Sequence, residues 1–446
     1  MSLTAKNNTP NGKLVVLGLD GLPLSLAKRL VASGRFPALA RLTEGATEMR
    51  AELPELSPVN WTSFYTAADP GEHGVYGFTR IHSQNYTMGL CSFEQPQVPT
   101  IFDKLGDTGF TSRIINLPNT YPARPIKGML ISGFVAENLD QAVYPRFLLN
   151  MLGNDYLLEA DTTTGKDDPA FLLDQLRQTL ASRRHALSLL WPDKAWDVFV
   201  LVLTETDRLF HFLFDAVEDD THPWHSECLN VLEEWDMLIG ELLDMYDALP
   251  APKRLMALAD HGFTRLITEV DINALLRNMG LFRTQLPPEA CSELDPQQIT
   301  GSCKAFALDP GRIYIHAANR FARGCVADAD IHALEQKIAS HLLGITYEGQ
   351  PVFKAIHKGS ELYTGKMAQY APNLVCEPIA GFDLKAKFNR TEPFGFFGRT
   401  GTHTVQDTFF YDTEGTQPER VRDTGKEILR HFGLKTEESA TVDLSF

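Results

Sequence analysis

Three short hydrophobic runs, each ending at a candidate acidic residue, constrain the fold of this chain most. They cover residues 13–20, 197–204 and 254–259. Runs of this length are typical of buried strands, and a long helical pattern at 225–247 separates the last two. A strand, a helix and a second strand in this order form a unit of parallel sheet with a right-handed crossover. The sequence therefore predicts an α/β fold with a mainly parallel β-sheet flanked by helices.

The rest of the chain predicts one large catalytic core with inserted cap segments. We expect the core at 13–264, with an insertion at about 80–165. Residues 265–395 are richer in proline, glycine and short strands, and we expect them to form an inserted cap subdomain. Residues 396–446 would then return to the core. Further helices are predicted at 23–34, 37–45, 58–67, 100–107, 169–191, from 206, and at 417–432, with a strand at 110–116.

Carboxylates and histidines follow the predicted strands, where sites form in open α/β sheets. Asp207 and His211 are four residues apart, so a helix places them on one face, although such pairs are also common on solvated helices. Carboxylates with imidazoles suit zinc, manganese or iron better than calcium. The whole set of carboxylates and histidines would arise by chance less often than any one of these motifs, and it predicts a two-metal site. The candidate ligands are Asp20, Ser57, Asp207, His211, Asp260, His261 and His403.

Ser57 is the candidate nucleophile. It precedes Pro58, which favours the first helical position, so we expect Ser57 to be an N-cap. A cap alone would be a purely structural role. A metal near the hydroxyl would allow it to ionise and attack phosphorus. The rival hydroxyls Thr62, Ser63 and Thr66 fall inside the helix, where such groups often bond to the backbone.

Composition excludes some functions and sets expectations for others. The net charge of −16 argues against general nucleic-acid binding, which needs a basic face. It does not exclude an anionic substrate, because bound metal ions can reverse the local charge. No segment has the roughly 18 apolar residues of a membrane span, and no signal sequence is visible. The six scattered cysteines predict reduced thiols, so we expect a cytoplasmic protein.

The motifs in their order resemble the alkaline phosphatase superfamily, in particular the type I phosphodiesterase/nucleotide pyrophosphatase family. The matching segments are 18–21, 57–66, 70–74, 207–211, 260–262 and 401–403. The resemblance implies one metal held by Asp207, His211 and His403. It implies a second held by Asp20, Asp260 and His261, with the Ser57 oxygen as a further ligand. The family nucleophile lies sixteen residues before the histidine of a Pro-x-x-His-Gly motif, and His73 leads back to Ser57.

Two departures from the family pattern bear on the substrate. Many nucleotide-type members have an asparagine shortly after the His-Gly motif, and this chain has Phe78 nearby instead. We therefore expect poor activity on nucleoside triphosphates. Pro58 has no N–H to offer beside Ser57, so another group must hold the transferring oxygens. Asn60 is a candidate substrate contact, although a helix-surface role is the alternative.

The sequence thus predicts a two-metal-dependent phosphoric ester hydrolase. We expect a phosphodiesterase that works through a phosphoseryl intermediate, uses two divalent ions, zinc or else manganese, and acts on a small-molecule phosphate ester. The alternatives are a phosphomonoesterase or phosphomutase at the same site, or an inactive metal-stabilised binding protein. A monoesterase usually needs an extra cation, for which Arg80, Lys104 and Arg399 are candidates. The oligomeric state is left open.

Overall fold

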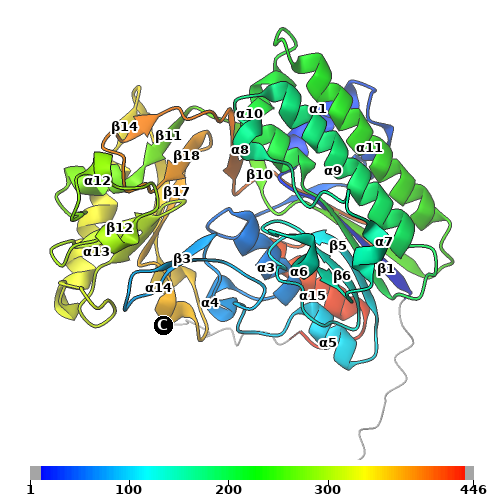
Figure 1. Cartoon of the computed structure of the whole chain (residues 1–446), viewed down its shortest axis with the longest axis horizontal. Coiled ribbons are helices and arrows are strands. Elements are labelled where there is room, and N and C mark those ends of the chain that lie inside the picture. The colour runs from blue at the N-terminus through cyan, green and yellow to red at the C-terminus, as the bar shows by residue number, and fades with distance from the viewer. Residues whose placement is uncertain (1–11, 437–446) are drawn as a thin grey trace, which may run out of the picture.

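An eight-stranded sheet forms the centre of the larger lobe (Figure 1). The computed structural model describes residues 12–436. Five neighbouring strands are parallel, and the edges are completed by β2, β21 and β7, which pair antiparallel with their neighbours. The sheet confirms the predicted α/β fold. Its order is β2 (Thr47–Met49), β21 (Thr408–Asp412), β9 (Lys253–Leu258), β1 (Lys13–Leu19), β8 (Val198–Leu203), β5 (Ser112–Leu117), β6 (Gly128–Ser132) and β7 (Val143–Tyr144).

Alternate residues of β1 enter two different hydrophobic cores, which explains why the whole run is apolar. Val15 and Leu17 contribute to the core on one face, and Leu14 and Val16 to the core on the other. Successive side chains of a strand point to opposite faces, so a sheet covered on both faces needs apolar residues throughout.

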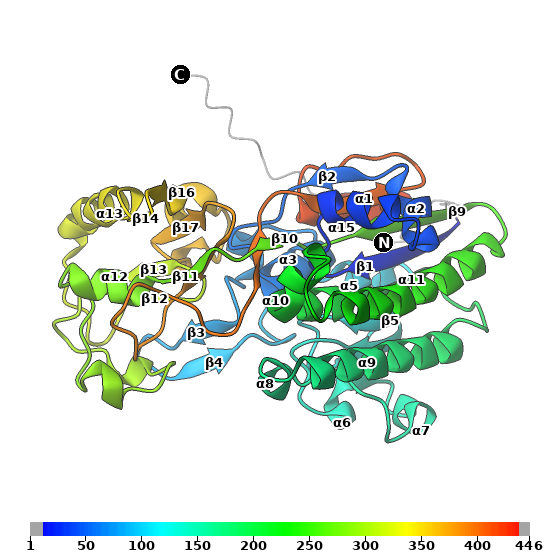
Figure 2. The ribbon, with the colours of Figure 1, turned by 90° about the horizontal axis from the view of Figure 1, so that it is seen from above.

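Two groups of helices provide these covers, on opposite sides of the sheet in Figure 1, and Figure 2 looks down on the first group. The first face packs against α1 (Leu24–Ala32), α2 (Pro37–Thr43), α9 (Pro169–Leu190), α10 (Glu205–Glu218) and α11 (His225–Asp247). The second face packs against α3 (Ser57–Thr66), α5 (Ile101–Asp107) and α15 (Val421–His431). These helices agree with the periodic patterns of the sequence within a few residues.

The smaller lobe has a hydrophobic core of its own, built almost entirely from residues 270–388. This range lies inside the cap that the sequence predicts at 265–395. One sheet contains β12 (Ala305–Leu308), β13 (Arg312–Ile315), β17 (Leu374–Pro378) and β16 (Phe353–Lys358). Another contains β18 (Phe382–Lys385), β11 (Thr268–Asp271) and β19 (Phe394–Gly395), with α12 (Ile272–Asn278) and α13 (Asp328–Leu343) beside them.

An antiparallel ribbon lies where the chain leaves the core for the cap and returns. It pairs β10 (Gly262–Arg265) with β20 (Gly401–Thr404). The ribbon begins directly after Asp260 and His261, and it contains His403. The last ten residues of the predicted return segment, 437–446, lie outside the described part of the chain.

The segment at 80–165 does not form one insertion, contrary to the prediction. Its strands β5, β6 and β7 belong to the central sheet, because their apolar residues complete the same two cores. Only the hairpin of β3 (Thr79–Ile81) and β4 (Met88–Leu90) extends to the cap. There Tyr86 enters the cap core, and the Arg312 guanidinium donates to the Thr79 carbonyl at 2.9 Å.

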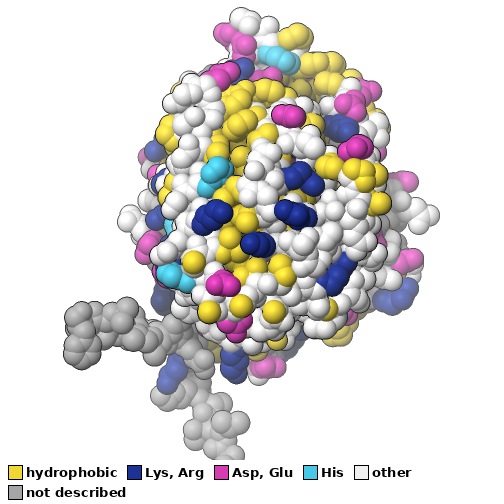
Figure 3. All heavy atoms as spheres, turned by 90° about the vertical axis from the view of Figure 1, so that its left-hand side faces the viewer, with side chains coloured by type: hydrophobic (Ala, Val, Ile, Leu, Met, Phe, Trp, Pro, Cys, Tyr) yellow, Lys and Arg dark blue, Asp and Glu magenta, His cyan; other side chains and the backbone are white. Residues whose placement is uncertain are grey.

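One face of the cap carries a group of basic side chains. Figure 3 faces this lobe and shows Lys and Arg side chains close together among apolar ones. The net charge of the whole chain is −16, so acidic residues predominate elsewhere. Within residues 12–436, no helix is both long and apolar enough to span a bilayer.

Candidate metal centre

The fold brings six of the predicted ligands together as two adjacent clusters. One cluster contains Asp207, His211 and His403, and the other contains Asp20, Asp260 and His261. Within each cluster the three ligand atoms lie within 4.8 Å of one another. The clusters are neighbours, since the rings of His261 and His403 stack with their centroids 3.8 Å apart.

The carboxyl ends of three adjacent strands explain this convergence. Asp20 follows β1, and Asp260 with His261 follows β9, its parallel neighbour. Asp207 lies in the first turn of α10, which begins just after β8 on the other side of β1. One further turn of α10 brings His211 to the same side, with Nε2 at 3.4 Å from Asp207 Oδ1. These strands are sequence-distant but adjacent in the sheet.

Three buried carboxylates meet here, and their repulsion needs a positive charge to offset it. Burial and the neighbouring Asp260 raise the pKa of Asp20 well above its usual range. Burial and Asp207 raise the pKa of Asp260 to about 7. Burial acts in the same direction on Asp207, but its favourable contacts, the Arg208 guanidinium among them, outweigh burial and hold the pKa of Asp207 well below its usual range.

The histidines are in the form that binds metals. Burial lowers the pKa of His211, His261 and His403, so their imidazoles are neutral. His403 Nδ1 donates to the Glu55 carbonyl at 2.8 Å, and His261 Nδ1 donates to the Gly262 carbonyl at 3.1 Å. These bonds fix the tautomer and leave the Nε2 lone pairs turned toward the carboxylates.

Acceptors therefore face acceptors across both clusters. His403 Nε2 lies 3.2 Å from Asp207 Oδ1, and His261 Nε2 lies 3.3 Å from Asp260 Oδ2. Asp260 Oδ2 has no hydrogen-bond partner among the described residues. Carboxylates and neutral imidazoles at this spacing fit divalent transition-metal ions, which prefer such mixed oxygen and nitrogen ligands.

Neighbouring side chains orient the candidate ligands. The Trp61 indole Nε1 donates to Asp20 Oδ2 at 2.9 Å, and the Thr206 hydroxyl donates to the Asp20 carbonyl at 2.6 Å. Arg208 Nη1 donates to Asp207 Oδ2 at 2.8 Å, which leaves Oδ1 toward the histidines. Supports of this kind fix ligand geometry, and their loss typically weakens metal binding.

Ser57 lies beside the second cluster. Its Oγ is 3.2 Å from His261 Nε2 and 3.5 Å from Asp20 Oδ1. The expectation of an N-cap is off by one residue, because Leu56 holds that position and Ser57 begins α3. The Ser57 hydroxyl makes no capping bond. It is instead turned toward the candidate ligands.

The rival hydroxyls are engaged elsewhere. Thr62 Oγ1 accepts from Asn119 Nδ2 at 2.7 Å, and Ser63 Oγ lies 3.0 Å from His73 Nε2. Thr66 Oγ1 donates to the Thr62 carbonyl, as hydroxyls inside helices often do. The His73 ring is fully buried and lies against Ser63 and the Val75 backbone N–H rather than against either cluster.

The prediction that Asn60 contacts the substrate is contradicted. Asn60 is fully buried rather than on the helix surface. Its Oδ1 accepts from the Glu52 backbone N–H at 2.6 Å, and its Nδ2 donates to the Leu56 carbonyl at 3.1 Å. The amide therefore braces the loop that leads to Ser57, and Asn60 lines neither of the two cavities beside the clusters.

A cavity of about 270 Å³ opens beside the Asp207 cluster, between the core and the cap. It is lined by Ser57 and by the Asp207 cluster, together with Phe78 and Phe134. Of the three cations considered from the sequence, Arg399 lines this cavity, whereas Arg80 and Lys104 do not. Two further cations line it that sequence reasoning missed, Arg208 and Lys385. The sequence could have indicated Arg208, because it directly follows the candidate ligand Asp207. No sequence pattern indicates that Lys385 lines the cavity.

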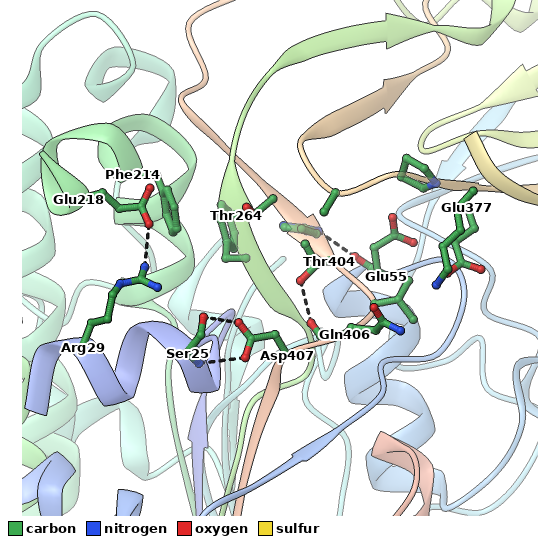
Figure 4. A pocket seen from close by; sticks show the side chains of 16 residues that line it. Ser25, Arg29, Glu55, Phe214, Glu218, Thr264, Glu377, Thr404, Gln406 and Asp407 are labelled. Carbon is green, nitrogen blue, oxygen red and sulfur yellow. Dashed lines mark hydrogen bonds and ion pairs between the residues drawn. The ribbon is translucent and has the colours of Figure 1, made fainter. Parts of the chain in front are cut away.

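A second cavity of about 280 Å³ lies on the other side of His403 and Glu55 (Figure 4). It contains an ion pair between Arg29 and Glu218, with 2.7 Å between Nη2 and Oε1. Glu55 lines both cavities and is buried, so burial raises its pKa to about 8. Its carboxyl is therefore largely uncharged at neutral pH. Ser57 lines only the first of these two cavities, which makes that one the candidate substrate site.

Three comparisons with known proteins bear on this site. A profile of the family described as type I phosphodiesterase / nucleotide pyrophosphatase matches residues 14–406. The matched range contains all seven residues of the candidate site. No curated protein sequence matches the chain.

Solved structures share the fold at low sequence identity. Phosphonoacetate hydrolase from Sinorhizobium meliloti 1021, in complex with phosphonoformate, is 15% identical with a TM-score of 0.61, covering 95% of this chain and 96% of that one. Murine ectonucleotide pyrophosphatase/phosphodiesterase 5 is 11% identical with a TM-score of 0.56 and 95% coverage of each. Alkaline phosphatase PafA is 12% identical with a TM-score of 0.58, covering 96% and 97%.

The family match covers most of the chain, and the architecture agrees with it. The protein belongs to the type I phosphodiesterase/nucleotide pyrophosphatase family of phosphoric ester hydrolases.

Proposed function

We propose that the protein is a phosphodiesterase that depends on two metal ions and transfers the phosphoryl group through Ser57. The observation that carries this proposal is the position of the Ser57 hydroxyl, 3.2 Å from His261 Nε2 at the edge of one ligand cluster. The Asp207 cluster lies beside this one and lines the same cavity as Ser57. A nucleophile next to two clusters of this composition suits phosphoryl transfer.

Asp207, His211 and His403 would hold one ion, and Asp20, Asp260, His261 and Ser57 the other. The ligand chemistry supports zinc, with manganese as the alternative. When bound, such ions supply positive charge that favours an ionised hydroxyl and offsets charge in the transition state.

The protein itself positions the reacting groups. Trp61 and Thr206 hold Asp20, and Arg208 holds Asp207, so the groups around the phosphate are oriented before the ester binds. Ser57 Oγ attacks phosphorus, and the leaving oxygen departs on the opposite side. Water then cleaves the phosphoseryl ester and regenerates Ser57. Phe78 and Phe134 form apolar walls that limit access of bulk water.

A phosphomonoesterase remains the second candidate, and one observation favours it. The cavity holds the cations Arg208, Lys385 and Arg399, and a monoester carries one more negative charge than a diester. Arg208 is engaged already, since it donates to Asp207 and, at 3.0 Å, to Glu159 Oε2. The family match supports the diester.

The experiment compares bis-p-nitrophenyl phosphate with p-nitrophenyl phosphate on protein loaded with zinc or with manganese. We expect the higher kcat/KM for the diester. A higher value for the monoester under matched metal conditions would assign the site to monoesters instead. No metal-dependent turnover of either ester, in protein shown to contain metal, would favour the inactive binding protein.

The cavity supports a small-molecule substrate. Its volume of about 270 Å³ is near the lower end for small-ligand sites. The related folds were solved with phosphonoformate in one case and with AMP in another, both small molecules. Because Phe78 lines the cavity near the position where an asparagine was expected, we propose that nucleoside triphosphates are poor substrates.

A further inference from the structure

The cap wall of the catalytic cavity carries two cations that share one carboxylate oxygen. Lys385 Nζ lies 2.7 Å from Asp383 Oδ2, and Arg399 Nη1 lies 3.4 Å from the same oxygen. All three residues line the cavity beside the Asp207 cluster. Two positive charges face one negative charge, so this group, which we name the Lys385–Arg399 pair, has an excess of one positive charge.

The Lys385–Arg399 pair has hydrogen-bond donors to spare. An ammonium has three N–H donors and a guanidinium has five. Within residues 12–436, Asp383 is the only salt-bridge partner of either cation. Lys385 is nine-tenths buried, and burying an ammonium is costly unless its donors are satisfied. An anionic ligand in the cavity would satisfy them.

Two other charged residues that line the cavity already have ion-pair partners of their own. Asp309 lines the cavity, but the Lys387 ammonium lies 2.9 Å from its Oδ2. Arg208 is held between Asp207 and Glu159. Neither neutralises the excess charge of the Lys385–Arg399 pair.

The position of the pair relative to Ser57 indicates which part of a substrate it would meet. Ser57 lies beside Asp20 and His261, at one end of the site. Arg399 is tied to the other end, because the next residue, Thr400, donates its backbone N–H to the His211 carbonyl at 2.8 Å. In an in-line displacement the leaving group lies opposite the nucleophile. The leaving group would therefore point toward the Lys385–Arg399 pair.

We propose that the leaving group of the natural ester carries an anionic group, a carboxylate or a phosphoryl group, and that Lys385 and Arg399 bind it. The proposal rests on the proposed function, because it takes Ser57 as the nucleophile. It narrows the substrates to esters with a negative charge at each end. Phe78 and Phe134, whose ring centroids are 5.5 Å apart, line the same cavity and would contact an apolar connecting segment.

The test uses methyl phosphodiesters that differ only at the far end of the leaving group. One releases 4-hydroxyphenylacetate, the second releases the neutral 4-hydroxyphenylacetamide, and the third releases 4-hydroxybenzylphosphonate. The first two phenols match in size and reactivity, so the ratio of their kcat/KM values isolates the charge. For wild type we expect a ratio of about 10 or more, as for a hydrogen bond to a charged group. The third ester shows whether a phosphoryl group is preferred to a carboxylate.

Three variants locate the effect. Lys385→Met and Arg399→Gln should each bring the ratio close to one, and the second variant serves if the first does not fold. The matched control is Lys354→Met. Lys354 is also a cap lysine, with Nζ 2.7 Å from Glu377 Oε1, but it lines the neighbouring cavity. This control should keep the wild-type ratio.

Binding of the free phenols, measured by calorimetry, tests the proposal without any turnover. Wild type should bind 4-hydroxyphenylacetate or 4-hydroxybenzylphosphonate about tenfold more tightly than the acetamide, and Arg399→Gln should not. If the metal-loaded enzyme turns over none of the three esters, the proposed function fails while binding still tests the anion site. Equal rates and equal binding for charged and neutral compounds would overturn the inference. The inference would also be overturned if Lys385→Met and Arg399→Gln slowed hydrolysis of a phosphomonoester with a neutral leaving group but left the ratio of the two kcat/KM values unchanged.

Discussion

Replacing Trp61 by phenylalanine should weaken metal binding at the Asp20 cluster without unfolding the protein. The indole Nε1 of Trp61 donates to Asp20 Oδ2 at 2.9 Å, and the ring is fully buried. Phenylalanine keeps an aromatic ring beside Phe64 but removes the donor. Asp20 Oδ2 would then lose its hydrogen bond, and the carboxylate would no longer be fixed with Oδ1 toward Ser57 and His261.

The magnitude follows from the type of bond that is lost. A hydrogen bond to a charged group contributes about 1.5–3 kcal/mol, and about 1.4 kcal/mol corresponds to a tenfold change in affinity. We therefore expect one of the two ions to bind about 10- to 100-fold more weakly, the range found for residues that orient metal ligands. The second ion, at the Asp207 cluster, should bind nearly as in wild type.

The assay is competition with a chelator of known zinc affinity, followed for both ions. Trp235→Phe is the matched control, because Trp235 is also buried and its Nε1 has no hydrogen-bond partner among the described residues. That control loses the same volume but no bond to a ligand. Unchanged zinc affinity in Trp61→Phe, or an equal loss in Trp235→Phe, would refute the orienting role of the indole.

Two further predictions concern metal content and pH. Elemental analysis after reconstitution should give two transition-metal ions per chain, as the two ligand clusters imply, and full activity with a maximum of one ion would contradict this. His357 and Lys354 hold the pKa of Glu377 at about 2, below its usual value of 4.5, so its contribution to stability is present above pH 4.5 and is lost as the pH falls toward 2. Because both partners are partly exposed, Glu377→Gln should lower the free energy of unfolding by about 2 kcal/mol at pH 7 and by much less near pH 2.5. Urea unfolding at the two pH values checks this, and an equal loss at both would contradict it.

The central sheet and the ligand clusters were within reach of the sequence because both follow from short-range patterns. The run that ends at Asp20 is apolar throughout, since both faces of β1 are covered. Polar residues follow directly after a strand that is buried in this way. The carboxyl ends of parallel strands lie at the same edge of the sheet, so these polar residues come close together. The pairing of β1 with β8 and β9 then brings Asp20, Asp207 and Asp260 together.

Features that depend on long-range packing could not be predicted in the same way. Lys385 enters the catalytic cavity because β18 pairs with β11 in the cap, and no local pattern around residue 385 indicates this. The helical position of Asn60 predicts an exposed side chain, but its amide is buried and hydrogen-bonded to the backbone of the loop before Ser57. The insertion expected at about 80–165 contains β5 to β7, but these strands complete the central sheet, and only the long-range pairing of β5 with β8 shows this.

Trapping the covalent intermediate tests the central claim most directly. Metal-loaded enzyme would be mixed with labelled diester, quenched at low pH and digested, and the labelled peptide would be mapped. The account predicts phosphate on Ser57, and it predicts that Ser57→Ala lowers turnover by orders of magnitude while the fold and at least one metal remain. Thr62→Val should have a much smaller effect, since Thr62 Oγ1 faces Asn119 and Tyr65. Label on Thr62, or a nearly active Ser57→Ala enzyme, would contradict the account.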